Sequence, residues 1–322
     1  MSLHPINPDL NALAVVLREP QQLELRELAL TSPGDGDVVV EMEWSGISTG
    51  TERLLWSGKM PAFPGMGYPL VPGYEGVGRI ASAGAQSGRT VGERVFVPGA
   101  RCYGEIRGLF GSSAARVVVP GAHVTPVDER LGERAILLAL AATGLHALKI
   151  GSSAPQLIIG HGVLGRLIAR LALLHGTGTA PVVWETNPAR RAGAAGYAVI
   201  DPADDTRRDY QRICDVSGDG GLLNGLIGRL APRGEIVLAG FYSAPLSFDF
   251  APAFMREAQL RIAAQWQKSD LAEVLTLCQS GELSLDGLIT HHSAALDATR
   301  AYRTAFEDAA CLKMILDWRN AA

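Results

Sequence analysis

The sequence predicts an α/β protein that combines a β-rich unit with a doubly wound parallel sheet. Residues 12–125 contain short β-branched runs bounded by Gly and Pro, which is the pattern of a small barrel or two-sheet unit. From about residue 130, apolar strands alternate with helical segments, and this alternation predicts a parallel sheet covered by helices. A length of 322 residues favours two domains.

The individual elements follow from these patterns in chain order. In the β-rich part we expect strands at 13–17, 37–44, 77–83, 92–99 and 115–121, and then a helix at 133–149. The alternating part predicts strands at 156–160, 181–185, 198–201, 213–218 and 235–241, with helices at 163–176, 189–196 and 221–234. The remaining residues predict helices at 270–279 and 296–305 and strands at 285–290 and 312–318.

Composition narrows the class of protein. With 19% charged and 47% hydrophobic residues the chain is globular, and a net charge of −4 argues against a nucleic-acid binder, which usually shows a basic excess. The longest nearly apolar stretch, 135–148, is shorter than the ~20 residues of a membrane span, so we expect a core helix and no transmembrane segment. The four cysteines are scattered, without CxxC spacing, which favours a reducing cytoplasm. Glycine is abundant, at 37 residues, and suggests places where the backbone approaches something closely.

The motif G-x-G-x-x-G occurs at residues 160–165, where an expected strand meets an expected helix. In a dinucleotide-binding loop, Gly160 permits the tight turn, Gly162 lets the pyrophosphate approach the backbone, and Gly165 lets the helix pack on the strand. The N-terminus of the helix then offers unpaired N–H groups to the phosphates. The cofactor-binding residues expected in this loop are Gly160, His161, Gly162, Val163, Leu164 and Gly165.

Glu185 follows the second strand, 20 residues after Gly165, where a carboxylate binds the ribose hydroxyls of the adenosine. An acid there favours NAD over NADP, although Arg190 and Arg191 follow soon after and leave NADP open. His161 either contacts a ligand or is an exposed loop histidine. Ser217 and Gly240 are expected at the carboxyl edge of the sheet, where cofactors bind.

A barrel, a dinucleotide-binding unit and a returning tail resemble the plan of the medium-chain dehydrogenase/reductase superfamily, over nearly the whole chain from about Leu13. The resemblance implies a GroES-like catalytic domain at 1–130 plus about 267–322, and a Rossmann domain at 131–266. It also implies that Leu164 and Thr143 border the nicotinamide ring.

In zinc alcohol dehydrogenases of this superfamily, a G-[IV]-C-x-[ST]-D motif and a G-H-E motif carry zinc ligands. The matching positions here are Ser48, in the segment GISTGTE, and Tyr74, in Gly-Tyr-Glu, while Ala139 lies at or near the third ligand position. Serine and tyrosine are poor zinc ligands and alanine is none. We therefore expect no metal site in the protein.

Without zinc, a side chain or a relay has to accept the proton of an alcohol. The resemblance places Tyr74 and Ser48 at the former metal position, with Thr49 and Thr51 available to pass the proton outward. Because a free tyrosine has a pKa near ~10, Tyr74 needs either a lowered pKa or a relay. Simpler alternatives remain: core packing for Tyr74 and a small turn residue for Ser48. Glu75 is expected to orient the site, or else to be a structural carboxylate paired with an arginine.

The segments at 44–52, 60–75, 158–167 and 184–197 resemble dehydrogenases of bacteriochlorophyll synthesis. That resemblance implies NAD-dependent oxidation of the 3-(1-hydroxyethyl) group of a (bacterio)chlorophyllide to 3-acetyl. The loop at 56–74 is rich in aromatic residues, Met and Pro, which suits a flat apolar macrocycle, or else simply caps the barrel core. The expected substrate-binding residues are Trp56, Met60, Phe63, Tyr68 and Trp266.

Two other functions stay open. One is a zinc-free NADPH-dependent quinone or enoyl reductase, and the other is a non-catalytic protein that delivers the pigment to an enzyme. The resemblance is also compatible with a homodimer and with transient contact with a membrane or with neighbouring enzymes of the pathway.

Overall fold

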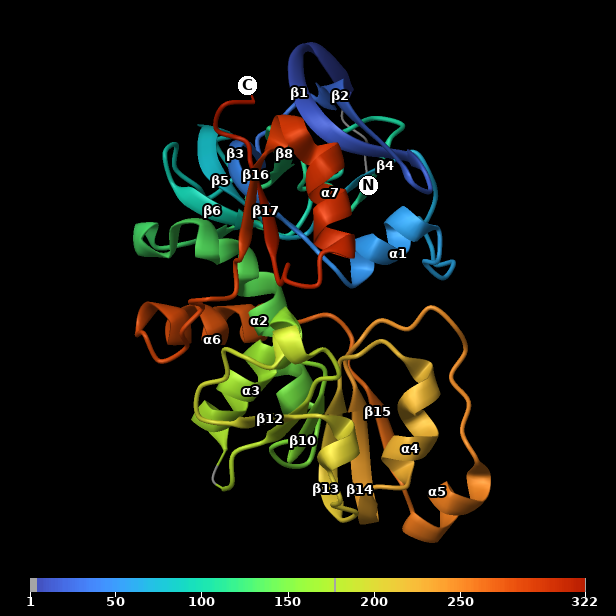
Figure 1. Ribbon diagram of the computed structural model, residues 1–322. Helices are drawn as coiled ribbons and strands as arrows, with labels where there is room; N and C mark the ends of the chain where they lie inside the picture. The colour runs from blue at the N-terminus through green and yellow to red at the C-terminus, as the bar shows by residue number, and fades with distance from the viewer. Residues whose placement is uncertain (1–4, 177, 322) are drawn as a thin grey trace. The chain divides into compact units, whose positions relative to one another are not determined.

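The computed structural model describes residues 5–176 and 178–321, which form two compact units (Figure 1). The first unit combines the chain up to Ala139 with the segment from Leu288 onward, and the second unit is Leu140–Gly287. Both boundaries differ from the expected ones, because residues 131–139 belong to the first unit and 267–287 to the second.

Ion pairs explain the second of these shifts. Helix α6 (Lys268–Gln279) carries a buried Asp270, which hydrogen-bonds His146 at 2.9 Å and Lys149 at 3.0 Å on α2 (Leu138–Lys149). These contacts hold α6 in the second unit, and they give His146 a hydrogen-bond partner inside the fold.

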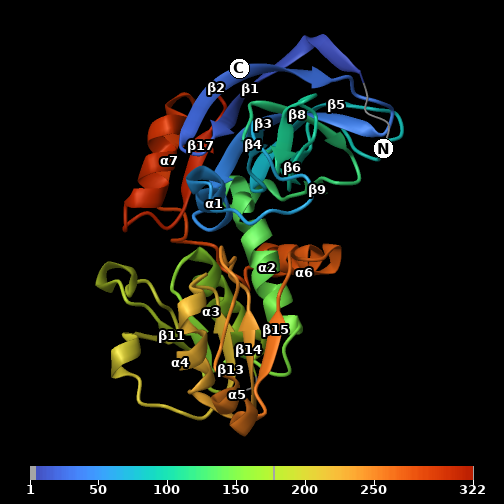
Figure 2. The ribbon, with the colours of Figure 1, turned by 90° about the vertical axis from the view of Figure 1, so that its right-hand side faces the viewer.

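The first unit consists of two sheets. The four-stranded sheet has the order β2-β1-β4-β7, and the seven-stranded sheet has the order β16-β17-β3-β5-β6-β9, with β8 paired to β3. Figure 2 shows β1 and β2 as a long hairpin. The strands are β1 (Ile6–Glu19), β2 (Gln22–Thr31), β3 (Asp37–Ile47), β4 (Leu70–Pro72), β5 (Gly76–Ala83), β6 (Arg94–Val97), β7 (Arg107–Leu109), β8 (Arg116–Pro120), β9 (Thr125–Pro126), β16 (His291–Ala294) and β17 (Met314–Asp317).

The tail returns to this unit as an added strand. β17 runs antiparallel to β3, with Met314 opposite Ile47 and Asp317 opposite Trp44. The strand expected at 285–290 is wrong, because those residues form turns and coil around Gly287, whose φ is +73°, and pairing starts only at His291. Helix α7 (Ala298–Glu307) buries Ala298, Ala301, Tyr302 and Ala305, which is the spacing of one helical face.

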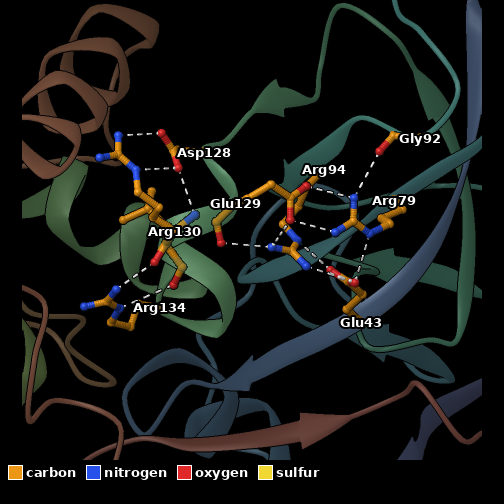
Figure 3. Close-up of polar contacts among 9 residues, drawn as sticks. Glu43, Arg79, Gly92, Arg94, Asp128, Glu129, Arg130 and Arg134 are labelled. Atoms are coloured by element: carbon orange, nitrogen blue, oxygen red, sulfur yellow. Dashed lines mark hydrogen bonds and ion pairs between the residues drawn. The ribbon is translucent and has the colours of Figure 1, made fainter.

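An ion network ties the seven-stranded sheet to the 3-10 helix η1 (Glu129–Leu137), as Figure 3 shows. Arg94 on β6 contacts Glu43 of β3 at 2.7 Å and Glu129 at 2.6 Å. Arg79 on β5 pairs with the same two carboxylates, at 3.2 and 2.7 Å. The start of η1 is thereby held on the first unit, which accounts for the first boundary shift.

The second unit is a parallel sheet with the order β12-β11-β10-β13-β14-β15, and all its strand pairs are parallel, as predicted. Figure 1 shows β13, β14 and β15 side by side. The order reverses between β10 and β13, which is where open α/β sheets bind ligands. The strands are β10 (Leu157–Ile159), β11 (Val182–Trp184), β12 (Ala198–Ile200), β13 (Tyr210–Asp215), β14 (Leu230–Leu238) and β15 (Gln259–Ile262).

The remaining helices belong to both units. Helix α1 (Thr51–Ser57) lies in the first unit, and the second unit contains α3 (Val163–His175), α4 (Leu223–Ile227) and α5 (Phe250–Arg256). The short 3-10 turns are η2 (Pro188–Arg190), η3 (Pro202–Asp204), η4 (Gly220–Leu222) and η5 (Ala295–Asp297).

Two helices of the second unit differ from prediction. The helix expected at 189–196 is wrong: η2 ends at Arg190, and the chain then turns at Gly193 and Gly196, whose φ values of +82° and +83° do not fit a right-handed helix. The helix expected at 221–234 ends at Ile227, because Leu230–Gly234 already belongs to β14.

One helical stretch, Glu129–Lys149, is long and apolar enough to cross a membrane by length and composition. Core helices of globular proteins meet the same criterion, and 61% of its most apolar window is buried inside the structure. Its burial agrees with the core helix that the sequence predicts.

Candidate functional site

The glycine-rich loop joins β10 to α3 in the second unit, as predicted. Gly160 has a φ of +102°, and a Cβ on Gly165 would lie 1.9 Å from the Gly160 carbonyl oxygen, so neither position tolerates a side chain. Gly162 caps α3 without any side-chain hydrogen bond, and no heavy atom lies within 4 Å of where its Cβ would be. The first N–H groups of α3 are thus accessible to a phosphate, and the loop fits a dinucleotide.

Glu185 lies directly beside this loop. Its Oε2 accepts a hydrogen bond from the His161 backbone N–H at 3.2 Å, and its Oε1 accepts one from Asn187 N–H at 2.8 Å. Arg191 donates to the Glu185 carbonyl at 2.8 Å and forms an ion pair with Asp201. The guanidinium of Arg191 is therefore neutralised by Asp201, and it belongs to the turn that holds Glu185.

His161 is not the exposed loop histidine that one alternative foresaw, because its side chain is fully buried. Its Nδ1 hydrogen-bonds the Arg190 carbonyl at 2.7 Å and its Nε2 hydrogen-bonds the Tyr197 hydroxyl at 2.9 Å. Burial lowers the pKa of His161, and both ring nitrogens are engaged within the protein. The side chain therefore braces the loop, and the backbone of His161 is engaged as well, since its N–H donates to Glu185 and its carbonyl accepts from Arg166.

Arg166, on the first turn of α3, completes this brace and was missed by the sequence analysis. It is buried and donates to the carbonyl oxygens of His161 at 3.0 Å, Arg190 at 2.9 Å and Ala192 at 2.8 Å. In the sequence, this role was indicated only by the presence of an arginine within a mostly apolar helix.

The other expected cofactor residues of the second unit lie at the carboxyl edge or on the flanking helices. A Cβ on Gly240 would lie 2.9 Å from the Gly218 backbone nitrogen, and a Cβ on Gly160 would lie 3.8 Å from the Ser217 backbone nitrogen. The loops that follow β10, β13 and β14 therefore lie close together at this edge of the sheet. Val163 is buried in α3, and Leu164 and Thr143 are half-buried on α3 and α2. Trp266 also lies in this unit and is half-buried.

In the first unit the structure brings Ser48 and Tyr74 together. The Ser48 Oγ lies 2.7 Å from the Tyr74 hydroxyl oxygen, and Thr51 on α1 hydrogen-bonds the same tyrosine. Burial and the nearby Glu75 raise the pKa of Tyr74 above its ordinary value of 10. The sequence left two routes open for Tyr74, a lowered pKa or a proton relay. This environment raises the pKa, so it favours the relay.

Behind this hydroxyl pair lie two buried carboxyl groups. Lys313, just before β17, donates to both oxygens of Glu75, at 2.9 and 2.6 Å, so the partner of Glu75 is a lysine and not the arginine considered above. Burial raises the pKa of Glu75, although Lys313 opposes the rise. A Cβ on Gly46 would lie 2.1 Å from Glu75 Oε2, and this close approach explains the glycine in the motif.

The second carboxyl group, Glu52 on α1, was not expected in the site. Its Oε2 accepts a hydrogen bond from the Tyr302 hydroxyl at 2.6 Å and its Oε1 accepts one from Ser48 N–H at 3.2 Å. Burial raises the pKa of Glu52 to about 7. Glu52 lies close to Ser48 in the sequence, and this proximity could have indicated its place in the site. Tyr302 and Lys313 are more than 200 residues away from Glu52 and Glu75, and only the return of the tail brings them here.

The third former ligand position, Ala139, is fully buried. Across residues 5–176 and 178–321, no three His, Cys, Asp or Glu side chains are arranged to hold a metal ion. His291 and His292 instead face Asp308 and Glu133, at 3.5 and 2.9 Å.

The expected substrate loop packs on its own apolar cluster. Met60 is buried with Leu55, while Trp56, Phe63 and Tyr68 are half-buried against this cluster. The Trp56 ring lies 6.4 Å from that of Tyr302, and Tyr68 donates to the Leu55 carbonyl. Some side chains of the loop thus cover core residues, whereas the rings of Phe63 and Tyr68 remain partly exposed.

Comparison with known proteins agrees with this architecture. Residues 34–129 match the family of the alcohol dehydrogenase GroES-like domain. A solved structure of acetophenone reductase from Geotrichum candidum, in complex with NAD, shares the fold with a TM-score of 0.82 at 18% identity, covering 98% of this chain and 99% of that one.

Two curated relatives are much closer in sequence, and both are named 2-desacetyl-2-hydroxyethyl bacteriochlorophyllide A dehydrogenase. The protein from Rhodobacter capsulatus is 55% identical over 95% of this chain and 98% of its own length. The protein from Cereibacter sphaeroides is 54% identical over 96% of this chain and 99% of its own length. The chain therefore belongs to the medium-chain dehydrogenase/reductase superfamily of nicotinamide-dependent oxidoreductases, within the family of the 2-desacetyl-2-hydroxyethyl bacteriochlorophyllide A dehydrogenases.

Proposed function

We propose that the chain oxidises the 3-(1-hydroxyethyl) group of a (bacterio)chlorophyllide to a 3-acetyl group with NAD, in bacteriochlorophyll a synthesis. The substrate class is supported by the names of the two relatives, which match this chain along nearly its whole length. The chemistry is supported by one observation above all: a hydrogen-bonded hydroxyl pair, Ser48 and Tyr74, occupies positions that carry zinc ligands in the resembling enzymes.

Residues of the second unit bind the cofactor, and residues of the first unit accept the proton of the alcohol. Gly160, Gly162 and Gly165 shape the loop that would hold the pyrophosphate, and the bound dinucleotide supplies the acceptor for the hydride of the alcohol carbon. Tyr74 and Ser48 accept the hydroxyl proton and pass it on, with Thr51 as a further hydroxyl of the relay. Loss of one hydride and one proton turns the secondary alcohol into the ketone, so atoms and charge balance.

NAD is preferred over NADP because of Glu185. The carboxylate faces the phosphate loop, where it would repel a 2′-phosphate and accept the ribose hydroxyls. Arg191, which could have compensated for that repulsion, is paired with Asp201. Titration of wild type and Glu185→Ala with NADH and NADPH tests this preference. We expect wild type to bind NADH more tightly and Glu185→Ala to lose the difference, whereas tighter binding of NADPH by wild type would overturn it.

The substrate loop supplies an apolar surface for the macrocycle, through the partly exposed rings of Phe63, Tyr68 and Trp56, which pack against a cluster that includes buried Met60. Trp266 stays a proposed substrate-binding residue from the sequence. The relatives do not favour the quinone or enoyl reductase alternative. The delivery protein, which would bind the pigment without hydride transfer, is separated from the enzyme by a kinetic assay.

The decisive experiment is incubation of the purified protein with NAD and the hydroxyethyl pigment. We expect the long-wavelength absorption band of the pigment to shift to the red as the acetyl group conjugates, together with stoichiometric NADH. Turnover of simple alcohols or quinones without any reaction of the pigment would contradict the proposal.

The proposal extends to location and assembly. A cytoplasmic enzyme is supported by the spacing of the four cysteines, which are scattered along the chain without CxxC pairs. A homodimer is supported by β15, which ends the described sheet and exposes all four of its residues. The exposed rings of Phe250 and Phe254 on α5 are suited to transient contact with a membrane or with another enzyme of the pathway.

A further inference from the structure

The peptide group between Ile47 and Ser48 is held from both sides by buried charged residues. Lys313 Nζ donates to the Ile47 carbonyl oxygen at 3.2 Å, and Glu52 Oε1 accepts from the Ser48 N–H at 3.2 Å. These two atoms belong to one planar peptide, so its orientation is fixed by both contacts. Since Ser48 Oγ meets Tyr74 at 2.7 Å, the clamp also fixes the hydroxyl pair.

The buried carboxyl groups of Glu52 and Glu75 differ in how closely a positive charge approaches them. Glu75 has the ammonium group of Lys313 on both of its oxygens, whereas Glu52 is bonded to a peptide N–H and to the neutral hydroxyl of Tyr302. Two carboxyl groups therefore share one cation in a buried space, and burial together with the charge of Glu75 raises the pKa of Glu52 to about 7. Glu52 thus changes its charge in the neutral pH range.

Glu52 can change its charge without releasing Ser48. An N–H group can only donate, so a proton on Glu52 must reside on Oε2, where it is donated to the Tyr302 hydroxyl oxygen. The Tyr302 hydroxyl can then turn toward Ser113, with which Tyr302 interacts electrostatically and whose buried Oγ has no hydrogen-bond partner among the described residues. Both protonation states keep the clamp intact.

We propose that Glu52 is a positioning residue of the reaction, which holds Ser48 against Tyr74 and whose charge makes this hydroxyl pair a better proton acceptor. The inference rests on the proposed function and names a group that regulates the same site. The negative charge of an ionised Glu52 attracts the proton that arrives at the hydroxyl pair from the alcohol and so favours its transfer. Neutralisation of Glu52 removes this effect and leaves the geometry in place.

The test is the pH profile of single-turnover pigment oxidation in Glu52→Gln, Tyr302→Phe and wild type. Wild type should speed up as the pH rises through about 7, where Glu52 ionises. Glutamine can accept from Ser48 N–H and donate to Tyr302, so Glu52→Gln mimics the protonated state. We expect it to lose this rise and to be about tenfold slower than wild type above it, because the attraction of the carboxylate for the arriving proton is lost.

The controls make the result specific. Glu307→Gln removes an exposed carboxylate from the same helix as Tyr302 and should retain the wild-type profile. Tyr302→Phe removes a hydrogen bond that lowers the pKa of Glu52, so its rise should move to higher pH, and this variant keeps the test valid if Glu52→Gln does not fold. An unchanged rise in Glu52→Gln or in Tyr302→Phe overturns the inference.

An infrared titration without substrate separates this inference from the proposed function. The carbonyl band of a buried protonated carboxyl group should disappear as the pH rises through about 7 and should be absent from Glu52→Gln. Lack of such a band overturns the role of Glu52 even if the pigment is oxidised. Presence of the band in a protein that does not oxidise the pigment at any pH overturns the proposed function alone.

Discussion

The hydroxyl group of Tyr74 lies in a chain of hydrogen-bonded hydroxyls, and its surroundings disfavour a negative charge on it. Burial and Glu75 raise its pKa, and its hydrogen bonds to Ser48 and Thr51 lead toward further hydroxyl groups. A relay needs each hydroxyl to donate and accept at once, which serine, threonine and tyrosine all can do.

Removal of either member of the pair should therefore slow the chemical step and leave cofactor binding unchanged. For Tyr74→Phe and Ser48→Ala we expect the single-turnover rate to fall by about 10²–10⁴-fold, the usual contribution of a positioned acid or base. The Kd for NADH, measured by fluorescence, should not move, since the cofactor loop lies in the second unit. Wild-type rates in both variants would contradict the relay.

Glu52 should also leave a mark on stability. Its pKa rises from an ordinary value of 4.5 to about 7 on folding, so the folded protein binds this proton more tightly than the unfolded chain does. The stabilisation is complete below pH 4.5 and is lost as the pH rises to about 7, by about 3 kcal/mol at 1.36 kcal/mol per pKa unit.

Denaturant unfolding of wild type and Glu52→Gln across this pH range measures the difference. The free energy of unfolding of wild type, relative to that of the variant, should fall between about pH 4.5 and 7 and stay constant above. A difference that does not depend on pH would show that Glu52 keeps its ordinary pKa.

At the scale of elements, the junction of β10 and α3 depends on close backbone approach. A Cβ at Gly165 would lie 1.9 Å from the Gly160 carbonyl oxygen, so the first turn of α3 could not stay where its N–H groups meet a phosphate. Buried His161 and Arg166 brace the same junction against the segment at 190–192.

Gly165→Ala should therefore weaken dinucleotide binding. Overpacking costs about 1–3 kcal/mol, and such a cost in the loop corresponds to a loss of NADH affinity of about ten- to hundredfold. Gly225→Ala in α4 is the matched control, because nothing lies within 4 Å of its added Cβ, and its Kd should equal that of wild type. Equal affinity in both variants would show that the loop does not hold the pyrophosphate.

For the whole molecule, the exposed edge strand β15 matters most. Strand edges with free N–H and C=O groups pair readily with another chain, and β15 adds an exposed Ile262 to that edge. Pairing of two copies about a two-fold axis would join the two sheets through antiparallel β15 strands and bring the exposed side chains of both strands together.

Light scattering during size-exclusion chromatography tests the homodimer. Wild type should elute as a dimer and Ile262→Lys as a monomer, because two copies of the lysine would face each other in a symmetric interface. Val91→Lys replaces an equally exposed apolar residue of the first unit, 61% exposed against 69% for Ile262, and should remain dimeric. A monomeric wild type would rule the homodimer out.

Local patterns were sufficient to predict the fold class, most strands of both units and the phosphate loop. β-Branched runs and the glycines of the G-x-G-x-x-G motif report on the backbone of a few adjacent residues, and such information is local. The helix expected at 189–196 was wrong for the same reason. Its composition allows a helix, but Arg166 and His161 bind carbonyl groups of that segment and hold it in a turn.

Sequence by itself therefore determined the fold class and the glycine-rich loop between β10 and α3, and the family resemblance pointed to Ser48 and Tyr74 as residues at positions that carry zinc ligands in related enzymes. Only the tertiary structure decided what surrounds that pair. β17 and α7 return to β3 and bring Lys313 to Glu75 and Tyr302 to Glu52, across 238 and 250 residues. The charge of a buried carboxyl group depends on the partners that exclude water from it, and these partners come together only when the tail docks.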